Sequence, residues 1–300
     1  MAGCSTGLRD STGVLLEAAD PSGPDSPRLR PDPGRPGHTA GVWRRLHGYS
    51  GPTIRHRAVS WVSANLFDDV TYTVRNGLNR GLRRRGGLGW LPLEHETPET
   101  RFWKSLHLRG KVVYDVGAFH GLLTIYCARV ARAVVAWEPN GRNRQRLVEN
   151  VLLNRFSNVT VRPYGLSSKS ARAEMRFDPL MPGMASLDFG VAAGVEHENV
   201  ELRTLDSEEG IEPPDLIKID VEGFELEVLE GATTTLRTGP DLYLEMHGAD
   251  AEDKRRRVLA ITDHLWKVGY RRILHVETAS YITPENPETA AQGHLYARRA

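Results

Sequence analysis

Long apolar runs, cysteine and net charge are all scarce in this chain. Its 300 residues include two cysteines and carry a formal net charge of +1. No stretch approaches the roughly 18 apolar residues that a membrane-spanning helix needs, and residues 1–40 lack the apolar centre of a secretion signal. The near-zero charge argues against adhesion of the whole protein to nucleic acid. We therefore expect a cytoplasmic protein, whose 40% hydrophobic content allows one large core and a small accessory region.

The two cysteines do not predict a disulfide or a metal site. Cys4 lies in residues 1–40, which are rich in Pro, Gly, Ser and Asp and which we expect to form a disordered tail. The next methionine after Met1 is Met175, so a misassigned start codon is an alternative explanation of this segment. Cys127 falls on an apolar helical stretch, where we expect a core thiol.

The most informative segment is residues 112–121, which read Val-Val-Tyr-Asp-Val-Gly-Ala-Phe-His-Gly. The apolar run is typical of a buried parallel strand. Gly117 lets the backbone turn tightly because it has no Cβ, and Gly121 permits a following helix to pack closely. This order predicts the nucleotide-binding first turn of a doubly wound α/β domain.

The acid in this segment distinguishes between two kinds of nucleotide. A dinucleotide places its pyrophosphate on the helix N-terminus, where a neighbouring carboxylate is unfavourable. Asp115 occupies that neighbourhood, and Phe119 replaces the middle glycine of the dinucleotide pattern. S-adenosylmethionine has no phosphate and carries an ammonium and a sulfonium group, which an acid attracts. The turn therefore favours S-adenosylmethionine over a nicotinamide cofactor, although an oxidoreductase stays open as an alternative.

A second acid follows at the distance expected for a ribose contact. Glu138 ends the apolar run over residues 134–137 and lies 21 residues after Gly117. An acid about 20 residues beyond the glycine turn accepts the ribose hydroxyls of an adenosine. Alternatively, Glu138 is a helix N-terminal acid, since Asn140 could cap a helix. Tyr164 follows another short strand and is predicted to flank the adenine.

Polar residues also end two later strands, over residues 215–220 and 241–245, and ligands bind at such carboxyl edges of open sheets. The predicted candidates for removing a proton from an acceptor are Asp220, Glu222, Glu245, His247 and His120. Asp220 could instead hold the ammonium of the methyl donor, and Glu222 could favour a helix N-terminus. We predict no metal, but convergence of Asp220, Glu222, Glu245 and His247 on a divalent cation stays open.

At these positions the chain resembles the FkbM-type methyltransferases, which depend on S-adenosylmethionine and mostly methylate oxygen. The resemblance covers about residues 86–247. It is carried by Val113–Ala118, Glu138–Asn140, Thr204–Asp206, Leu229–Ala232 and, most specifically, the string Lys-Ile-Asp-Val-Glu-Gly-Phe-Glu over residues 218–225.

The resemblance implies a class I methyltransferase fold, a Rossmann-like α/β sheet of seven strands with the last antiparallel. It implies O-methylation of a sugar, glycan or polyketide-like hydroxyl. An RNA or lipid-linked substrate, or a non-catalytic cofactor-binding scaffold, stays open. The predicted catalytic residues are Asp220, Glu222 and His247. The predicted cofactor-binding residues are Asp115, Gly117, Ala118, Gly121, Glu138, Pro139, Tyr164 and Asp220.

The methyltransferase domain is predicted over residues 106–300. The preceding residues 41–105 are expected to form a cap that is helical and basic. Residues 41–110 hold 12 Lys and Arg against 5 Asp and Glu, and helical periodicity is found over residues 53–67. The arginines could be solvated, could clamp a phosphate-bearing acceptor, or could contact RNA or an anionic membrane.

Residues 170–189 predict a β-hairpin that covers the donor pocket. The segment alternates as a strand over residues 171–177, breaks at Asp178-Pro179 and returns over residues 183–187. Met181 and Met184 could line an apolar acceptor site, although methionine commonly fills core gaps. Beyond His247 we expect a helix over residues 252–268, a strand over residues 271–276 and a closing edge strand over residues 293–297.

Overall fold

The computed structural model describes residues 68–86, 96–178, 181–186, 196–248, 250–290 and 293–299. For residues 177–178, 181–186 and 288–289 it describes the backbone alone. The predicted tail over residues 1–40 and the predicted helix over residues 53–67 lie outside the described residues.

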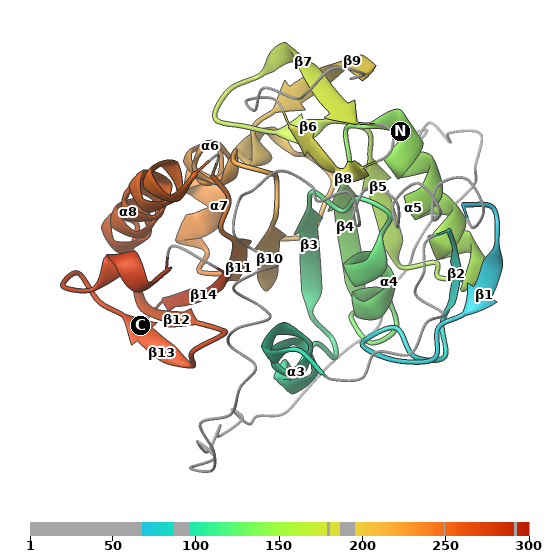
Figure 1. The fold of residues 1–300 in the computed structure, drawn as a ribbon, viewed down its shortest axis with the longest axis horizontal. Helices are drawn as coiled ribbons and strands as arrows, with labels where there is room; N and C mark the ends of the chain where they lie inside the picture. Colours follow the sequence, from blue (N-terminus) through green and yellow to red (C-terminus); the bar gives the residue numbers. More distant parts are fainter. Residues whose placement is uncertain are drawn as a thin grey trace, which may run out of the picture.

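A central eight-stranded sheet organises the molecule (Figure 1). Its spatial order is β13-β12-β14-β11-β10-β3-β4-β5. Strands β5, β4, β3, β10 and β11 are parallel, and β14 is antiparallel to both of its neighbours. The strands are β3 (Val112–Val116), β4 (Ala133–Trp137), β5 (Val159–Arg162), β10 (Leu216–Ile219), β11 (Asp241–Glu245), β12 (Tyr270–His275), β13 (Ser280–Ile282) and β14 (His294–Arg299).

This topology confirms the predicted fold class and corrects two details. The chain winds outward from β3 to β5 and then returns to the other side of β3 at β10, so the order reverses beside β3. A ligand crevice forms where such a sheet changes direction. The sheet has one strand more than expected, because β13 pairs with β12 at the edge. The last strand, β14, is not at the edge but lies between β11 and β12.

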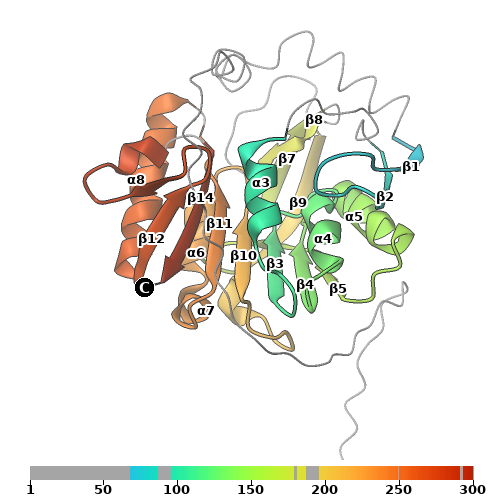
Figure 2. The same ribbon diagram turned by 90° about the horizontal axis from the view of Figure 1, so that it is seen from below.

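Helices cover both faces of this sheet (Figure 2). On one face, α3 (Pro98–Ser105), α4 (Leu122–Ala128) and α5 (Gly141–Leu153) share a core cluster with Val113 and Val134. On the other face, α6 (Glu225–Glu230), α7 (Thr233–Arg237) and α8 (Ala251–Lys267) pack against Val112 and Val135. Alternate residues of each strand thus enter different clusters, which explains why the strands read as continuous apolar runs.

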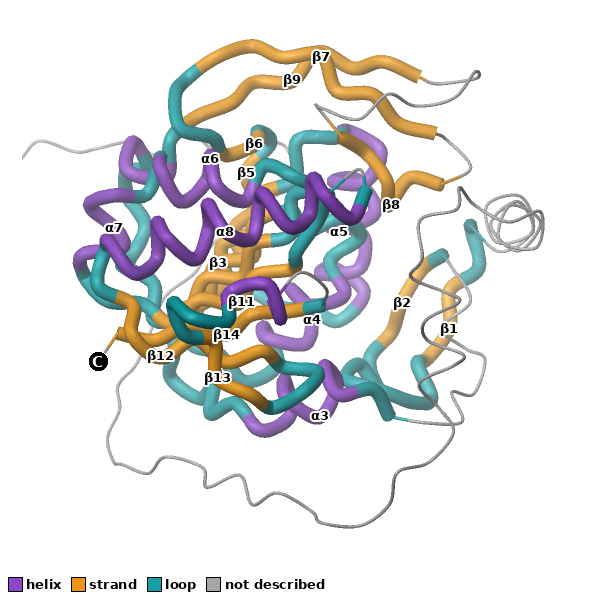
Figure 3. Tube along the Cα trace, turned by 60° about the vertical axis from the view of Figure 1, so that its left-hand side comes forward, coloured by secondary structure: helices purple, strands orange, loops and turns teal. Residues whose placement is uncertain are grey.

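A second, four-stranded sheet packs beside the first (Figure 3). Its order is β6 (Gly165–Leu166), β9 (Glu196–Arg203), β7 (Ala171–Asp178) and β8 (Met181–Ser186). The β7–β8 pair confirms the predicted hairpin, whereas β9 was not predicted. The acceptor role predicted for Met181 and Met184 concerns side chains outside those that the structure describes.

The part of the basic cap that the structure describes is only partly helical. Residues 98–105 form α3, but residues 68–86 form a hairpin of β1 (Thr71–Thr73) and β2 (Arg83–Arg85). The β-branched threonines and the positive φ angles of Gly77 and Gly81 favour this hairpin over a helix. It is held to α5, and Arg85 contacts Asp69 at 2.7 Å, while the three roles considered for these arginines stay predictions.

Two further expectations from composition can be compared with the structure. Cys127 is a buried free thiol, which confirms its assignment to the core. Among the described helices, none is both long and apolar enough to cross a bilayer.

Candidate functional site

The β3–α4 turn packs directly on the end of β10. Gly117 has a φ of +78°, and a Cβ there would overlap the carbonyl oxygen of Asp220. Gly121 has a φ of +76°, and a Cβ there would overlap the side chain of Leu147 on α5. Both glycines are therefore required by the close approach of neighbouring elements, as the sequence predicts. Between them, Phe119 also adopts a positive φ of 52°.

Glu138 follows β4 and faces this turn. Its carboxylate accepts hydrogen bonds from the backbone N–H of Phe119 at 2.8 Å and of Asn140 at 2.9 Å. The side chain is buried, and burial raises the pKa of Glu138 to about 7 even though the two N–H groups favour the charged form. Asn140 caps α5 by accepting from the N–H of Asn143. Glu138 thus lies at the turn and also beside the N-terminus of α5. This position is compatible both with a ribose contact and with a helix N-terminal acid.

Asp115 lies beneath the turn instead of facing the crevice. It is 1% exposed, and its Oδ2 accepts from the hydroxyl of Thr124 at 2.6 Å. Its Oδ1 is 3.2 Å from the ammonium of Lys218. Lys218 thus pairs with the charge of Asp115, and attraction of a cationic cofactor by Asp115 stays a prediction.

Lys218 itself was not predicted as a functional residue. Its Nζ donates to the carbonyl of Gly117 at 2.7 Å and is 3.2 Å from Asp220 Oδ2. Burial disfavours its charge, but Asp115 and Asp220 outweigh burial and raise the pKa of Lys218. The available signal was a lysine within the otherwise apolar strand Leu-Ile-Lys-Ile.

Four carboxylates surround one imidazole at the carboxyl ends of β10 and β11. The Nε2 atom of His247 lies 3.8 Å from Asp220, 3.6 Å from Glu222 and 3.6 Å from Glu245. Its Nδ1 contacts the carboxylate of Glu225 at 2.9 Å. We call these five residues the His247 cluster. The sequence analysis left open that Asp220, Glu222, Glu245 and His247 converge, and it did not include Glu225.

The charges of this cluster bear on which residue can act as a base. Although burial opposes the charged form, the Glu225 contact and the charges of Glu222 and Asp220 raise the pKa of His247 to about 10. In this arrangement the imidazole is protonated at neutral pH and cannot accept a proton. Burial raises the pKa of Glu222 to about 7 and also raises that of Asp220. A carboxylate therefore suits the role of base better than His247 does.

A second group of charged side chains, Glu99, Glu277 and His294, lies next to Glu245. His294, at the start of β14, contacts Glu277 at 2.6 Å and lies 3.5 Å from Glu245 and 3.9 Å from Glu99. Burial alone would raise the pKa of Glu245, but the contact with His294 outweighs it and lowers this pKa to about 2. No local pattern predicts this contact, because Glu99 and His294 are far apart along the chain.

The remaining predicted residues have different surroundings. The N–H of Ala118 donates to the carbonyl of Trp137 at 3.0 Å, and the carbonyl of Pro139 accepts from Arg144. The hydroxyl of Tyr164 donates to Glu208 at 2.6 Å, and the guanidinium of Arg203 lies over its ring.

His120 is a poor candidate for a base. Its ring stacks on Phe119, with ring centroids 3.8 Å apart. Burial and nearby arginines, Arg84 above all, lower the pKa of His120 to about 3. The imidazole is therefore neutral at physiological pH but too weakly basic to remove a hydroxyl proton efficiently.

Three side chains of the His247 cluster could hold a metal ion. Asp220, Glu222 and His247 each offer one ligand atom, and these atoms lie within 4.8 Å of one another. They come from the segments that follow β10 and β11.

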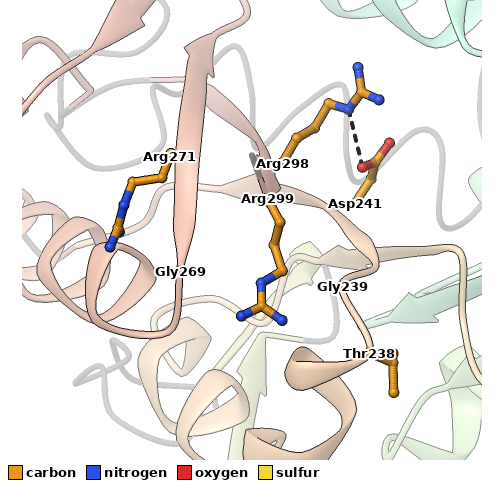
Figure 4. Close-up of a pocket in the computed structure, with 7 residues that line it drawn as sticks. All are labelled: Thr238, Gly239, Asp241, Gly269, Arg271, Arg298 and Arg299. Atoms are coloured by element: carbon orange, nitrogen blue, oxygen red, sulfur yellow. Dashed lines mark ion pairs between the residues drawn. The ribbon is translucent and has the colours of Figure 1, made fainter.

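A separate hollow lies at the opposite edge of the sheet (Figure 4). Its volume is about 720 Å³, and its lining residues are Thr238, Gly239, Asp241, Gly269, Arg271, Arg298 and Arg299. Asp241 is the first residue of β11, whereas Glu245 is its last. Arg298 lies 3.3 Å from Asp241, and Arg299 donates to the carbonyl of Arg237. These arginines secure the end of β14 and are distant from the His247 cluster along the strand.

Comparison with known families places these residues in one domain. A family model described as the methyltransferase FkbM domain matches residues 115–272, which is more than half of the chain. The matched range includes Glu138, Lys218 and every member of the His247 cluster.

Individual relatives were also found. A segment of 153 residues is 33% identical to the hexuronic acid methyltransferase AglP of Haloferax volcanii, and covers 47% of this chain. Another is 30% identical over 156 residues to the methyltransferase sdnD of Sordaria araneosa, covering 40% of this chain. The chain spans 59% of the length of each relative. A solved methyltransferase FkbM from Methylobacillus flagellatus is 20% identical, covering 67% of this chain and 48% of that one, with a TM-score of 0.45.

Proposed function

The chain belongs to the FkbM methyltransferase family, and from this membership we propose that it transfers a methyl group from S-adenosylmethionine to a hydroxyl oxygen. The acceptor is a sugar, a glycan or a polyketide-like natural product. The observation that carries the proposal is that the turn at Gly117 contacts both Glu138 and Asp220, the first acid of the His247 cluster, at the carboxyl edge of the sheet. Similarity to a hexuronic acid methyltransferase favours a sugar as the acceptor. The proposal includes a cytoplasmic location, which rests on the sequence alone.

The cofactor is assigned to the side of the crevice formed by β3 and β4. Glu138 accepts hydrogen bonds from the ribose hydroxyls, because each carboxylate oxygen has a lone pair beyond the one that its backbone N–H occupies. Gly117 allows close approach of the cofactor, with Ala118 and Gly121 completing the turn, and Pro139 borders the adenine. Binding of the ammonium by Asp220 is the alternative to its role in the His247 cluster. Asp115 acts indirectly, by holding Lys218 under the turn, and the ring of Tyr164, whose hydroxyl bonds Glu208, is assigned to the adenine.

The acceptor is assigned to the side formed by β10 and β11. Its hydroxyl oxygen attacks the methyl carbon in line, the C–S bond breaks with its electron pair passing to sulfur, and the hydroxyl proton passes to a carboxylate of the His247 cluster. Alignment of the reacting atoms contributes several kcal/mol, and a positioned base accelerates the reaction about 10²–10⁴-fold. Of the predicted catalytic residues, Asp220 and Glu222 are assigned as the carboxylates that take the proton, and the protonated His247 is assigned to hold them in place.

Thermal unfolding with added ligands tests the cofactor. S-adenosylmethionine and its demethylated product should raise the melting temperature, and NAD should not, since a ligand at 100 times its Kd stabilises by about 2.7 kcal/mol. Glu138→Ala should abolish the shift, while alanine at the exposed Glu209 should preserve it. A shift with NAD alone would favour an oxidoreductase, and an unchanged shift in Glu138→Ala would refute the ribose assignment.

Transfer of a labelled methyl group tests the reaction. We expect label on free sugars or hexuronates and none on acceptors whose hydroxyl and carboxyl groups are blocked. A methyl ether resists mild alkali, whereas a methyl ester on a hexuronate carboxylate does not, so alkali treatment identifies the methylated oxygen. Cofactor binding without transfer to any acceptor would favour a non-catalytic scaffold. Loss of transfer between about 50 and 200 mM salt would instead indicate a multiply phosphorylated substrate such as RNA.

A further inference from the structure

We propose that Asp220, Glu222 and His247 bind a divalent metal ion, and that this ion holds the oxygens of an anionic or diol-bearing acceptor. The first part stands on the geometry of the side chains. The second part rests on the proposed methyl transfer.

The three ligand atoms already have the spacing of a coordination sphere. A metal with ligands at about 2.1 Å keeps adjacent ligand atoms about 3 Å apart and opposite ones about 4.2 Å apart. His247 Nε2 lies 3.6 Å from Glu222 Oε2 and 3.8 Å from Asp220 Oδ1. All three ligand atoms lie within 4.8 Å of one another. Small rotations of the carboxylates suffice to close this group on an ion.

The imidazole is oriented as metal-binding histidines are. Its Nδ1 contacts Glu225, whose side chain is 1% exposed and which also accepts from the N–H of Gly223 at 3.0 Å. A carboxylate that fixes one ring nitrogen directs the other toward a metal. His247 Nε2 faces three carboxylate oxygens at 3.6–3.8 Å, which is too far for a hydrogen bond. Among the residues that the structure describes, this nitrogen has no acceptor within hydrogen-bond distance, and a metal ion would bind it in place of its proton.

The charge of the surroundings favours a cation. Four carboxylates face the single imidazole of the His247 cluster, and Glu99 and Glu277 lie on its far side around His294. Three cations offset part of this negative charge: His247, His294 and Lys218, which is shared between Asp220 and Asp115. The carboxylates of the cluster would repel the carboxylate of a hexuronate unless a bound cation lay between the cluster and the hexuronate.

The ligand types indicate which ion fits. Two carboxylates favour Mg²⁺ and Mn²⁺, while imidazole suits transition metals, so the mixed set favours Mn²⁺ over Mg²⁺ or Ca²⁺. Three protein ligands leave coordination positions open for two acceptor oxygens. An ion there lowers the pKa of a bound hydroxyl, so that the hydroxyl loses its proton to water before it attacks.

Manganese titration tests the site independently of catalysis. Untagged full-length protein, stripped with EDTA and dialysed, is titrated with Mn²⁺ while the electron paramagnetic resonance signal of the free ion is recorded. We expect one ion per chain, with affinity weakened at least tenfold in Glu222→Gln and His247→Gln and unchanged in Glu209→Gln. The thermal shift with S-adenosylmethionine shows that each variant is folded. Absence of binding, or equal binding by folded variants, would overturn the site.

Methyl transfer in EDTA tests the role of the ion. We expect EDTA to remove transfer and Mn²⁺ to restore it, with the cofactor-induced thermal shift unchanged throughout. Full transfer in EDTA would refute the role of the ion in acceptor binding. If no acceptor is methylated under any condition, the proposed function fails, while the manganese titration still decides the metal site.

Discussion

At the scale of single residues, the ammonium of Lys218 connects the β3–α4 turn with the His247 cluster. It bonds the carbonyl of Gly117 in the β3–α4 turn and lies 3.2 Å from both Asp115 and Asp220. A buried charge is tolerated when it has partners of this kind, and its removal would leave Asp115 uncompensated in the core. Lys218 is therefore a positioning residue, because it sets the turn and the first acid of the His247 cluster in one arrangement.

Glu138 gives the clearest dependence on pH at this scale. Its pKa of about 7 follows from burial, and ribose hydroxyls would donate to its ionised form. Protonation below pH 7 therefore competes with cofactor binding. Between pH 8 and pH 6 the ionised fraction falls from about nine-tenths to about one-tenth, so we expect the Kd for S-adenosylmethionine to rise up to about tenfold, measured by calorimetry. Glu138→Gln should bind weakly at both pH values; the same pH dependence in this variant would contradict the assignment.

At the scale of elements, the site depends on contact between the β3–α4 turn and the end of β10. Gly117 allows that contact because it lacks a Cβ and tolerates a positive φ. Gly110 has nearly the same φ, +75°, but no atom within 4 Å of where its Cβ would be. The two glycines therefore separate the cost of the backbone conformation from the cost of the overlap.

We predict that Gly117→Ala is more destabilising than Gly110→Ala. Gly110→Ala should lower the free energy of unfolding by about 1–2 kcal/mol through its left-handed backbone. Gly117→Ala should lower it by about 1–3 kcal/mol more, because the overlap with Asp220 forces the backbone apart, and it should also lose the cofactor-induced thermal shift. Urea unfolding measures both. Equal losses in the two variants would show that the turn can move away from β10 without cost.

The elements differ in how far the sequence could predict them. The strands ending at Asp115, Glu138 and Asp220 were predictable, because an apolar run followed by an acid or a glycine is a local pattern. The insertion of β14 between β11 and β12 was not, since strand order depends on pairing between distant segments. For the same reason, the meeting of strand-end acids at one edge was predictable, but the contacts of Glu99 and His294 were not.

At the scale of the whole molecule, β14 is the last strand in sequence but lies inside the sheet. It bonds β11 on one side and β12 on the other, and its first residue, His294, lies beside Glu245. Leu295 is fully buried in the core cluster that also holds α6, α7 and α8. The carboxyl-terminal strand thus connects the core to the acidic side of the candidate site.

Loss of packing at β14 should consequently weaken the molecule as a unit. We predict that Leu295→Ala lowers the free energy of unfolding by about 2–5 kcal/mol, whereas alanine at Leu152, which is 48% exposed, changes it by less than about 0.5 kcal/mol. Tryptophan fluorescence reports on the fully buried Trp103 and Trp137, on opposite faces of the sheet, and circular dichroism reports on the helices. Both probes should show one coincident transition in Leu295→Ala. Two separate transitions would mean that the β11–β14–β12 edge unfolds independently, and the acidic side of the site could then open while the cofactor turn stays folded.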